Sequence, residues 1–239
     1  VSGTGADQAA VIRGELVSTG SSTLVLNGDN SSLSVSDSGS ITNLADGVAQ
    51  RAVSMAADNI TLTNAGFISG NVGVQMLGLD TSVINTGTIE ATGNVLVGTS
   101  MYAVRMRSFS EDAERINTLE NHGTLISNFF AIDAGDAESG GLNALTTAHI
   151  TNTGDIYGDI RLGGLDDELH NSGYINGEID MGDDDDLYIG EQGFVETGNN
   201  IYLGSGDDEA FGNWDGGVLF IGTKGKLLAD CYGANPRLL

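Results

Sequence analysis

The chain has 239 residues, of which 40% are hydrophobic and 6% aromatic, and it contains 36 Gly but 1 Pro. Its formal net charge of −24 argues against nucleic acid as a partner, because phosphate binding needs clustered Lys and Arg. No apolar run reaches the roughly 18 residues of a membrane-spanning helix, and the one cysteine, Cys231, cannot support a disulfide framework.

The N-terminal part carries weak strand signals, namely Leu24, Leu26, Leu33 and Val35. We expect residues 1–38 to form the first coils of a stack together with a cap that covers its open end. Beyond them a glycine-centred element of the form [ND]-x-G-x-[IL] recurs, with looser spacing toward the N-terminus. Its corner glycines are Gly39, Gly66, Gly87 and Gly123.

Two stretches interrupt this pattern. Residues 101–120 hold Arg105, Arg107 and Arg115, three of the nine cationic residues, and Ser110 could cap a short helical turn there. Residues 133–147 contain Gly140-Gly141 and have the composition of a loop. We expect both to be insertions on the outside of the stack, where insertions form a binding face or tolerated surface loops.

One unit repeats three times between residues 150 and 212. Each copy contains I-x-[LM]-G, followed three and four residues after the glycine by an acidic pair, and each is preceded by a second glycine element. Gly154 and Gly173 are 19 residues apart, and Gly173 and Gly193 are 20 apart. A fixed period near 20 without helical segments predicts a parallel β-helix, which is an all-β solenoid.

Apolar residues alternate within each unit, as in Ile179-Asp180-Met181, which indicates a strand with one buried face. Such short strands bury that face only when the next coil stacks on it. The Asn two residues before the corner glycine is expected to form a ladder of side-chain amides from coil to coil, or else to act as a turn former. We expect the following side chains to point inward: Ile156, Ile160, Leu162, Ile175, Ile179, Met181, Ile201 and Leu203.

The C-terminal stretch changes character, with the only tryptophan and the only lysines of the chain in residues 213–239. We interpret it as the last coils or a C-terminal cap. Residues 1–239 are therefore expected to form a single β-helix domain, since a solenoid grows in one dimension without a second core.

The units 152–167 and 171–186, of the form N-x-G-x-I-x-G-x-I-x-[LM]-G, resemble repeats in the passenger regions of bacterial autotransporters and related large surface adhesins. The resemblance covers residues 64–212 well and implies a right-handed, single-stranded parallel β-helix. The resemblance does not predict an activity, because passengers include adhesins, proteases and esterases. The chain lacks a membrane barrel, so we expect a released passenger, a fragment or a separately secreted protein.

The acidic pairs are the sharpest local feature. In-register stacking would place them above one another at the strand spacing of roughly 4.8 Å, where the carboxylates repel unless cations or protons intervene. Ca²⁺, with six to eight oxygen ligands, fits such a column. The alternative is solvated corners in which each Asp caps a turn. The candidate metal ligands are Asp166, Asp167, Asp185, Asp186, Asp207 and Asp208.

The sequence favours a non-enzymatic structural or adhesive module, extracellular or on a bacterial cell surface. Its expected partners are copies of itself, or a glycan or protein outside the cell, and Ca²⁺ is a possible stabilising ion. An alternative is a hydrolase or lyase acting on polysaccharide, in which Asp166, Asp167 and His170 are near one another in sequence. A second alternative is a carbohydrate-binding rod. Repeated carboxylate pairs and scattered histidines speak against a single catalytic site.

Overall fold

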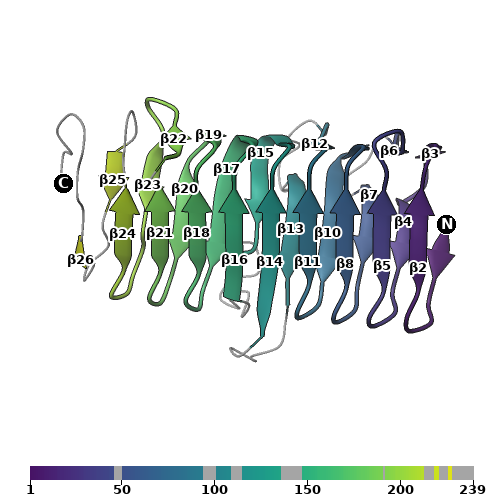
Figure 1. Cartoon of the computed structure of the whole chain (residues 1–239), viewed down its shortest axis with the longest axis horizontal. Coiled ribbons are helices and arrows are strands. Elements are labelled where there is room, and N and C mark those ends of the chain that lie inside the picture. The colour runs from purple at the N-terminus through teal and green to yellow at the C-terminus, as the bar shows by residue number, and fades with distance from the viewer. Residues whose placement is uncertain are drawn as a thin grey trace.

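The computed structural model describes residues 1–45, 50–93, 101–108, 115–135, 147–190, 192–212, 218–220 and 226–227. Every regular element in these ranges is a β-strand, and the strands pair in parallel. Figure 1 shows them side by side along the long axis, with the N-terminus at one end. The expected all-β, parallel, solenoid-like architecture is confirmed. Within the described ranges, no helix has the length and apolar character needed to cross a bilayer.

The strands form three stacks, and one strand from each stack makes a coil. The first and third stacks belong to one 16-stranded sheet because β15 and β17 bend through both, and the second stack is a 10-stranded sheet. The first stack contains β1 (Ser2–Gly3), β4 (Ser22–Leu26), β7 (Arg51–Met55), β10 (Val72–Leu77), β13 (Tyr102–Arg107), the later parts of β15 (Thr124–Asp133) and β17 (Asp155–Gly163), β20 (Ile179–Gly182), β23 (Asn200–Tyr202) and β25 (Val218–Phe220).

The second stack faces the viewer in Figure 1 and follows the first stack within each coil. It contains β2 (Ala9–Ile12), β5 (Ser32–Val35), β8 (Thr61–Asn64), β11 (Ser82–Asn85), β14 (Ile116–Asn121), β16 (Thr147–Asn152), β18 (Glu168–Asn171), β21 (Leu187–Gly190), β24 (Glu209–Gly212) and β26 (Lys226–Leu227). The third stack contains β3 (Glu15–Ser18), β6 (Ser40–Asn43), β9 (Phe67–Gly70), β12 (Thr88–Ala91), the first parts of β15 and β17, β19 (Tyr174–Asn176) and β22 (Phe194–Val195).

The core lies between the stacks and consists of apolar rows that run from coil to coil. In the second stack, register aligns one buried residue per coil, from Leu62 through Leu119 to Tyr188. The eight side chains predicted to point inward between Ile156 and Leu203 are all buried, so that prediction is confirmed. The alternation of apolar and polar residues therefore determines which side chains point into the core, because each coil buries the apolar edge of the previous one.

A second row in the interior is polar. Asn64, Asn85, Asn121, Asn152 and Asn171 are buried and aligned, and the Nδ2 of each of the first four donates to the Oδ1 of the next, at 2.8 to 2.9 Å. Each amide thus satisfies its neighbour away from water, where an unpaired amide would be costly. The predicted amide ladder is confirmed, and it explains why Asn keeps its offset from the corner glycine.

The corner glycines beside this ladder are required by crowding. At Gly154 an added Cβ would lie 2.1 Å from the carbonyl oxygen of Gly123, and at Gly173 it would lie 2.1 Å from that of Gly154. Backbone atoms cannot yield at such a distance without opening the spacing between coils. Glycine is therefore fixed at this corner by the close approach of successive backbones.

The predicted insertion at 101–120 is wrong for its described residues. Residues 102–107 form β13 and residues 116–121 form β14, both paired within the stacks. The arginines of β13 made its sequence look like an exposed loop. Val104 and Met106 are buried in the core, whereas Arg105 and Arg107 alternate with them and project to the other face of the sheet. Residues 109–114, including most of the expected helical turn, lie outside the described residues.

The other expected boundaries are met in part. Asp133 ends β15 and Thr147 begins β16, so both limits of the predicted 133–147 insertion belong to strands, while 136–146 lie outside the described residues. Residues 1–38 contribute β1 to β5 to the stacks. In the 213–239 stretch only β25 and β26 are described, and they pair with β23 and β24.

Candidate functional site

The predicted acidic pairs share one corner of the molecule, between the first and second stacks. Register aligns Gly163 with Gly182, and a further bridge joins Asp183 to Ser205. The glycine that opens each turn has positive φ, at +133° for Gly163 and +117° for Gly182. The sequence was right to treat I-x-[LM]-G as the approach to a turn, because this backbone conformation favours glycine.

The structure separates each pair into two rows, and the inner row is buried. Asp167, Asp186 and Asp208 are at most 2% exposed. Their Oδ1 atoms accept hydrogen bonds from the backbone N–H of the preceding coil: from Ala148 at 2.7 Å, from Asp167 at 2.8 Å and from Asp186 at 3.1 Å. Each inner Asp therefore caps a backbone donor that would otherwise be buried without a partner.

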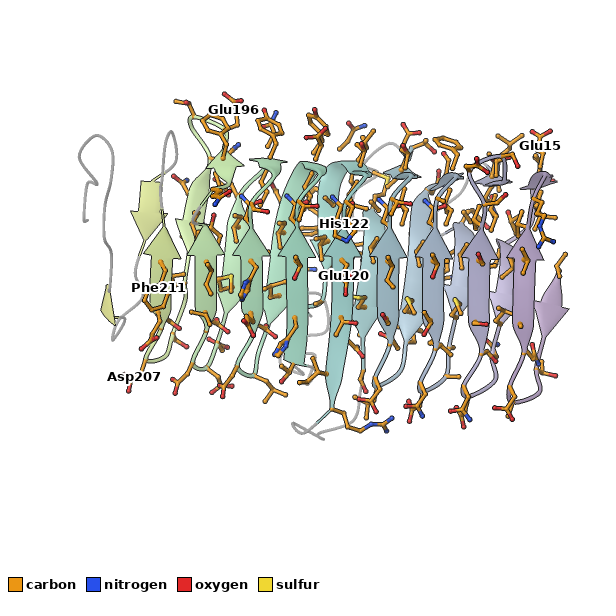
Figure 2. The ribbon with its side chains drawn as sticks, in the orientation of Figure 1. Glu15, Glu120, His122, Glu196, Asp207 and Phe211 are labelled. Atoms are coloured by element: carbon orange, nitrogen blue, oxygen red, sulfur yellow. The ribbon has the colours of Figure 1, made fainter. Side chains whose placement is uncertain are left out.

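The outer row, formed by Asp166, Asp185 and Asp207, is exposed. Here the hydrogen bonds run the other way along the stack. Asp166 Oδ1 accepts from the N–H of Asp185 at 3.1 Å, and Asp185 Oδ1 accepts from the N–H of Asp207 at 2.7 Å. Figure 2 shows Asp207 at the lower edge of the molecule. Asp166 and Asp185 thus act as turn caps although both residues are exposed.

Burial changes the ionisation of the inner row. Removal from water raises the pKa of Asp167 well above its usual value and raises the pKa of Asp186 to about 8, with smaller contributions from neighbouring carboxylates. The pKa of Asp208 is raised for the same reason, and the charges of Asp185 and Asp207 add to it. In all three the Oδ2 atom is buried and has no hydrogen-bond partner. Burial therefore shifts all three carboxyls toward the neutral, protonated form.

An uncharged residue does the same task in an earlier coil. Asn117 occupies the position in its coil that Asp167 occupies two coils later. Register aligns Thr118 with Glu168 through the strand between them, and Asn117 and Asp167 directly precede these two residues. Asn117 is fully buried. Its Oδ1 accepts from the N–H of Thr81 at 2.9 Å. Sequence reasoning missed Asn117 because no I-x-[LM]-G precedes it, and only the register of the stack reveals the equivalence.

The carboxylates of this corner do not converge on one point. Among the described residues, no group of three or more His, Cys, Asp and Glu side chains has an arrangement that could hold a metal ion. Five of the six carboxylates are oriented by a hydrogen bond that they accept from a backbone N–H group. No such bond is described for Asp207. Calcium binding therefore stays a prediction that concerns the outer row.

A second polar cluster surrounds Asp133, which is fully buried on β15. Its Oδ2 accepts from Arg107 Nη2 at 2.7 Å, and its Oδ1 accepts from Arg161 Nη2 at 2.7 Å. Arg105 Nε lies 3.2 Å from Oδ2. Burial of such a charge requires opposite charges and hydrogen bonds around it. Asp133 thus fixes Arg105 and Arg107, which the sequence had assigned to an insertion, together with Arg161 of the repeat unit.

Two histidines that are distant in the sequence, His149 and His170, lie close together on the outer face of the second stack. Glu168 lies between His149, whose Nδ1 is 3.6 Å from Oε2, and His170, whose Nε2 contacts Oε1. His170 had been considered together with Asp166 and Asp167. Asp167 is buried at the corner, while His170 is partly exposed on β18 and has Glu168 as its partner. The suggested acid–base group is therefore divided between two environments.

No model of a protein family matches the chain, and no curated protein or solved structure matches it either. The resemblance to autotransporter passengers remains a prediction drawn from the repeat motif.

Proposed function

We propose that the chain is a non-enzymatic structural or adhesive module of a bacterial surface or secreted protein, built as a single right-handed parallel β-helix. The observation that carries the proposal is the continuous amide ladder from Asn64 to Asn171, which keeps successive coils in register inside the core. Such a stack is stiff along its axis and presents long outer faces. A stiff rod with displayed faces suits attachment or spacing outside a cell.

Charge supports an extracellular or cell-surface location. A net charge of −24 keeps a rod soluble and limits non-specific sticking to anionic surfaces. The repeat motif supports the same setting through its resemblance to surface passengers. Partners would then be further copies of the chain, or a glycan or protein outside the cell, and calcium would stabilise the acidic corner.

Electron microscopy of the purified protein, with and without Ca²⁺, tests this proposal. We expect uniform rods, alone or associated. Globular particles would contradict it. The same preparation incubated with polysaccharides should release no reducing ends and no unsaturated products, and steady cleavage would instead support the hydrolase or lyase alternative. Labelling of intact source cells with an impermeant reagent tests the location.

A further inference from the structure

Aromatic side chains gather on the outer face of the third stack. Tyr174 aligns with Asp155 in the preceding coil and with Phe194 in the following coil, and Tyr157 aligns with Asn176 two positions further along the strands. The ring centroids of Tyr157 and Tyr174 are 5.6 Å apart, and those of Tyr174 and Phe194 are 5.9 Å apart. The three rings therefore form one strip across β17, β19 and β22.

Two of the three rings are exposed, and that of Tyr174 is partly buried. Only 6% of the chain is aromatic, yet Tyr157 is 39% exposed and Phe194 is 37% exposed. Elsewhere on the same face of the third stack, Val17 and Phe67 are also exposed. Large rigid side chains of this kind contribute more in the core, and an exposed cluster of them is typical of a recognition surface.

Polar side chains border the strip and are held in place by hydrogen bonds. Tyr174 Oη donates to Glu196 Oε2 at 2.6 Å, and this bond is the main reason that the pKa of Tyr174 is raised to about 12. Asn199 Nδ2 donates to Asn176 Oδ1 at 3.2 Å. Figure 2 shows Glu196 projecting at the upper edge, on the side opposite Asp207. This surface is thus separate from the acidic corner.

The mixture of groups indicates the class of ligand. Aromatic rings pack against the C–H faces of sugar rings, and sugar hydroxyls both donate and accept hydrogen bonds. The amides of Asn176 and Asn199 also do both, while Asp155 and Glu196 accept. The charged groups of a cationic peptide only donate, so they would use Asp155 and Glu196 but not the amide donors of Asn176 and Asn199. The nearby carboxylates and the net charge of −24 disfavour an anionic chain.

We propose that Tyr157, Tyr174, Asn176, Phe194, Glu196 and Asn199, together called the aromatic–amide face, bind an uncharged glycan. The strip crosses three successive coils, so the glycan chain would lie along the long axis of the molecule. This proposal rests on the adhesive function proposed above and assigns its ligand. It can fail while the rod remains, in which case the module is structural and does not bind glycans here.

The test is retardation of the full chain in native gels cast with defined polysaccharides. The uncharged probes are galactomannan, arabinoxylan, dextran and mixed-linkage β-glucan. Polygalacturonate serves as the anionic probe, and chitosan and polylysine serve as cationic probes. We expect retardation by at least one uncharged polysaccharide and none by polygalacturonate.

Three alanine variants locate the binding surface, and a fourth variant, Tyr174→Phe, tests the hydroxyl. Tyr174→Ala and Phe194→Ala should each weaken retardation at least tenfold. Phe67→Ala removes an equally exposed ring, 38% exposed, from the same face four coils away from Tyr174, and should leave binding unchanged. Melting curves of all three check that the fold is kept. Tyr174→Phe keeps the ring but loses the bond to Glu196, and should weaken binding less than Tyr174→Ala.

The possible outcomes separate the proposals. No retardation by any uncharged probe, or equal loss with Phe67→Ala, would overturn the glycan site. Retardation by polylysine and chitosan alone would overturn it in favour of cation binding to the acidic surface. In each of these cases rods in the electron microscope would leave the structural role intact, whereas globular particles would remove the proposed function itself.

Discussion

The backbone N–H of Asp167 donates to Oδ1 of Asp186, 2.8 Å away in the next coil. The carboxyl that accepts this bond is buried, and its Oδ2 has no partner. The acceptor role needs an oxygen but no charge, as the amide of Asn117 demonstrates in an earlier coil. The inner acidic row is therefore a structural cap in which burial disfavours ionisation of the carboxyls.

The first prediction concerns pH. The folded-state pKa of Asp186, about 8, lies above the ordinary value of 3.8 that the unfolded chain has. Between these values the folded protein holds a proton that the unfolded protein releases, so the unfolding free energy falls as pH rises. One fully linked proton changes it by up to about 1.4 kcal/mol per pH unit. Denaturant unfolding at pH 5, 7 and 9 should show stability falling along this series.

The second prediction isolates this carboxyl by substitution. Asp186→Asn keeps the oxygen that accepts from Asp167 and removes the charge, so at pH 8 it should raise the unfolding free energy by about 1–3 kcal/mol. It should also flatten the pH dependence. Asp185→Asn, on the exposed outer row, is the matched control and should change stability by less than about 0.5 kcal/mol. Equal effects of the two would mean that general charge repulsion dominates.

The third prediction concerns the amide ladder. Asn121→Ala leaves Oδ1 of Asn152 without its donor and removes the shortest of the three bonds of Asn85 Nδ2, whose other two go to the carbonyl oxygens of Gly87 and Thr124. An orphaned buried acceptor costs about 1–3 kcal/mol, so denaturant unfolding should show a loss of at least that size. Asn27→Ala, at an exposed position, serves as the control. A loss as small as that of the control would show that water replaces the ladder.

The fourth prediction compares two glycines. Gly154→Ala places a Cβ 2.1 Å from the carbonyl oxygen of Gly123, whereas Gly14→Ala meets no atom within 4 Å. We expect Gly154→Ala to lower soluble yield and melting temperature sharply, because two coils must separate to admit the methyl group. Gly14→Ala should melt like the parent protein. Similar curves for both variants would show that the coil spacing is soft.

The fifth prediction concerns calcium. If Ca²⁺ binds the outer row of the folded protein alone, a hundredfold excess over Kd stabilises it by about 2.7 kcal/mol, and the melting temperature rises. Mg²⁺ should do less because it requires stricter geometry. Asp166→Asn with Asp185→Asn should reduce the rise. Identical melting curves in chelator and in millimolar Ca²⁺ would show that these aspartates are turn caps without metal.

The repeat by itself determined the stacking of parallel strands. Alternation at Ile179 and Met181 fixed the inward face, and the constant offset between Asn152 and Gly154 predicted the amide ladder. These features are readable because every coil must bury the same edge and satisfy the same backbone groups. The local periodicity of the sequence is therefore sufficient to predict the stack of parallel strands.

Only the tertiary structure decided what lies beside what across coils of unequal length. It showed that buried Asp133 accepts hydrogen bonds from Arg107 and Arg161. This pairing allows the charged strand that contains Arg107 to lie within the sheet. The tertiary structure also divided neighbouring aspartates such as Asp185 and Asp186 between solvent and interior, because adjacent residues at a turn point in different directions. Tyr174 and Phe194 each follow a corner glycine in the sequence, but register alone brings their rings together.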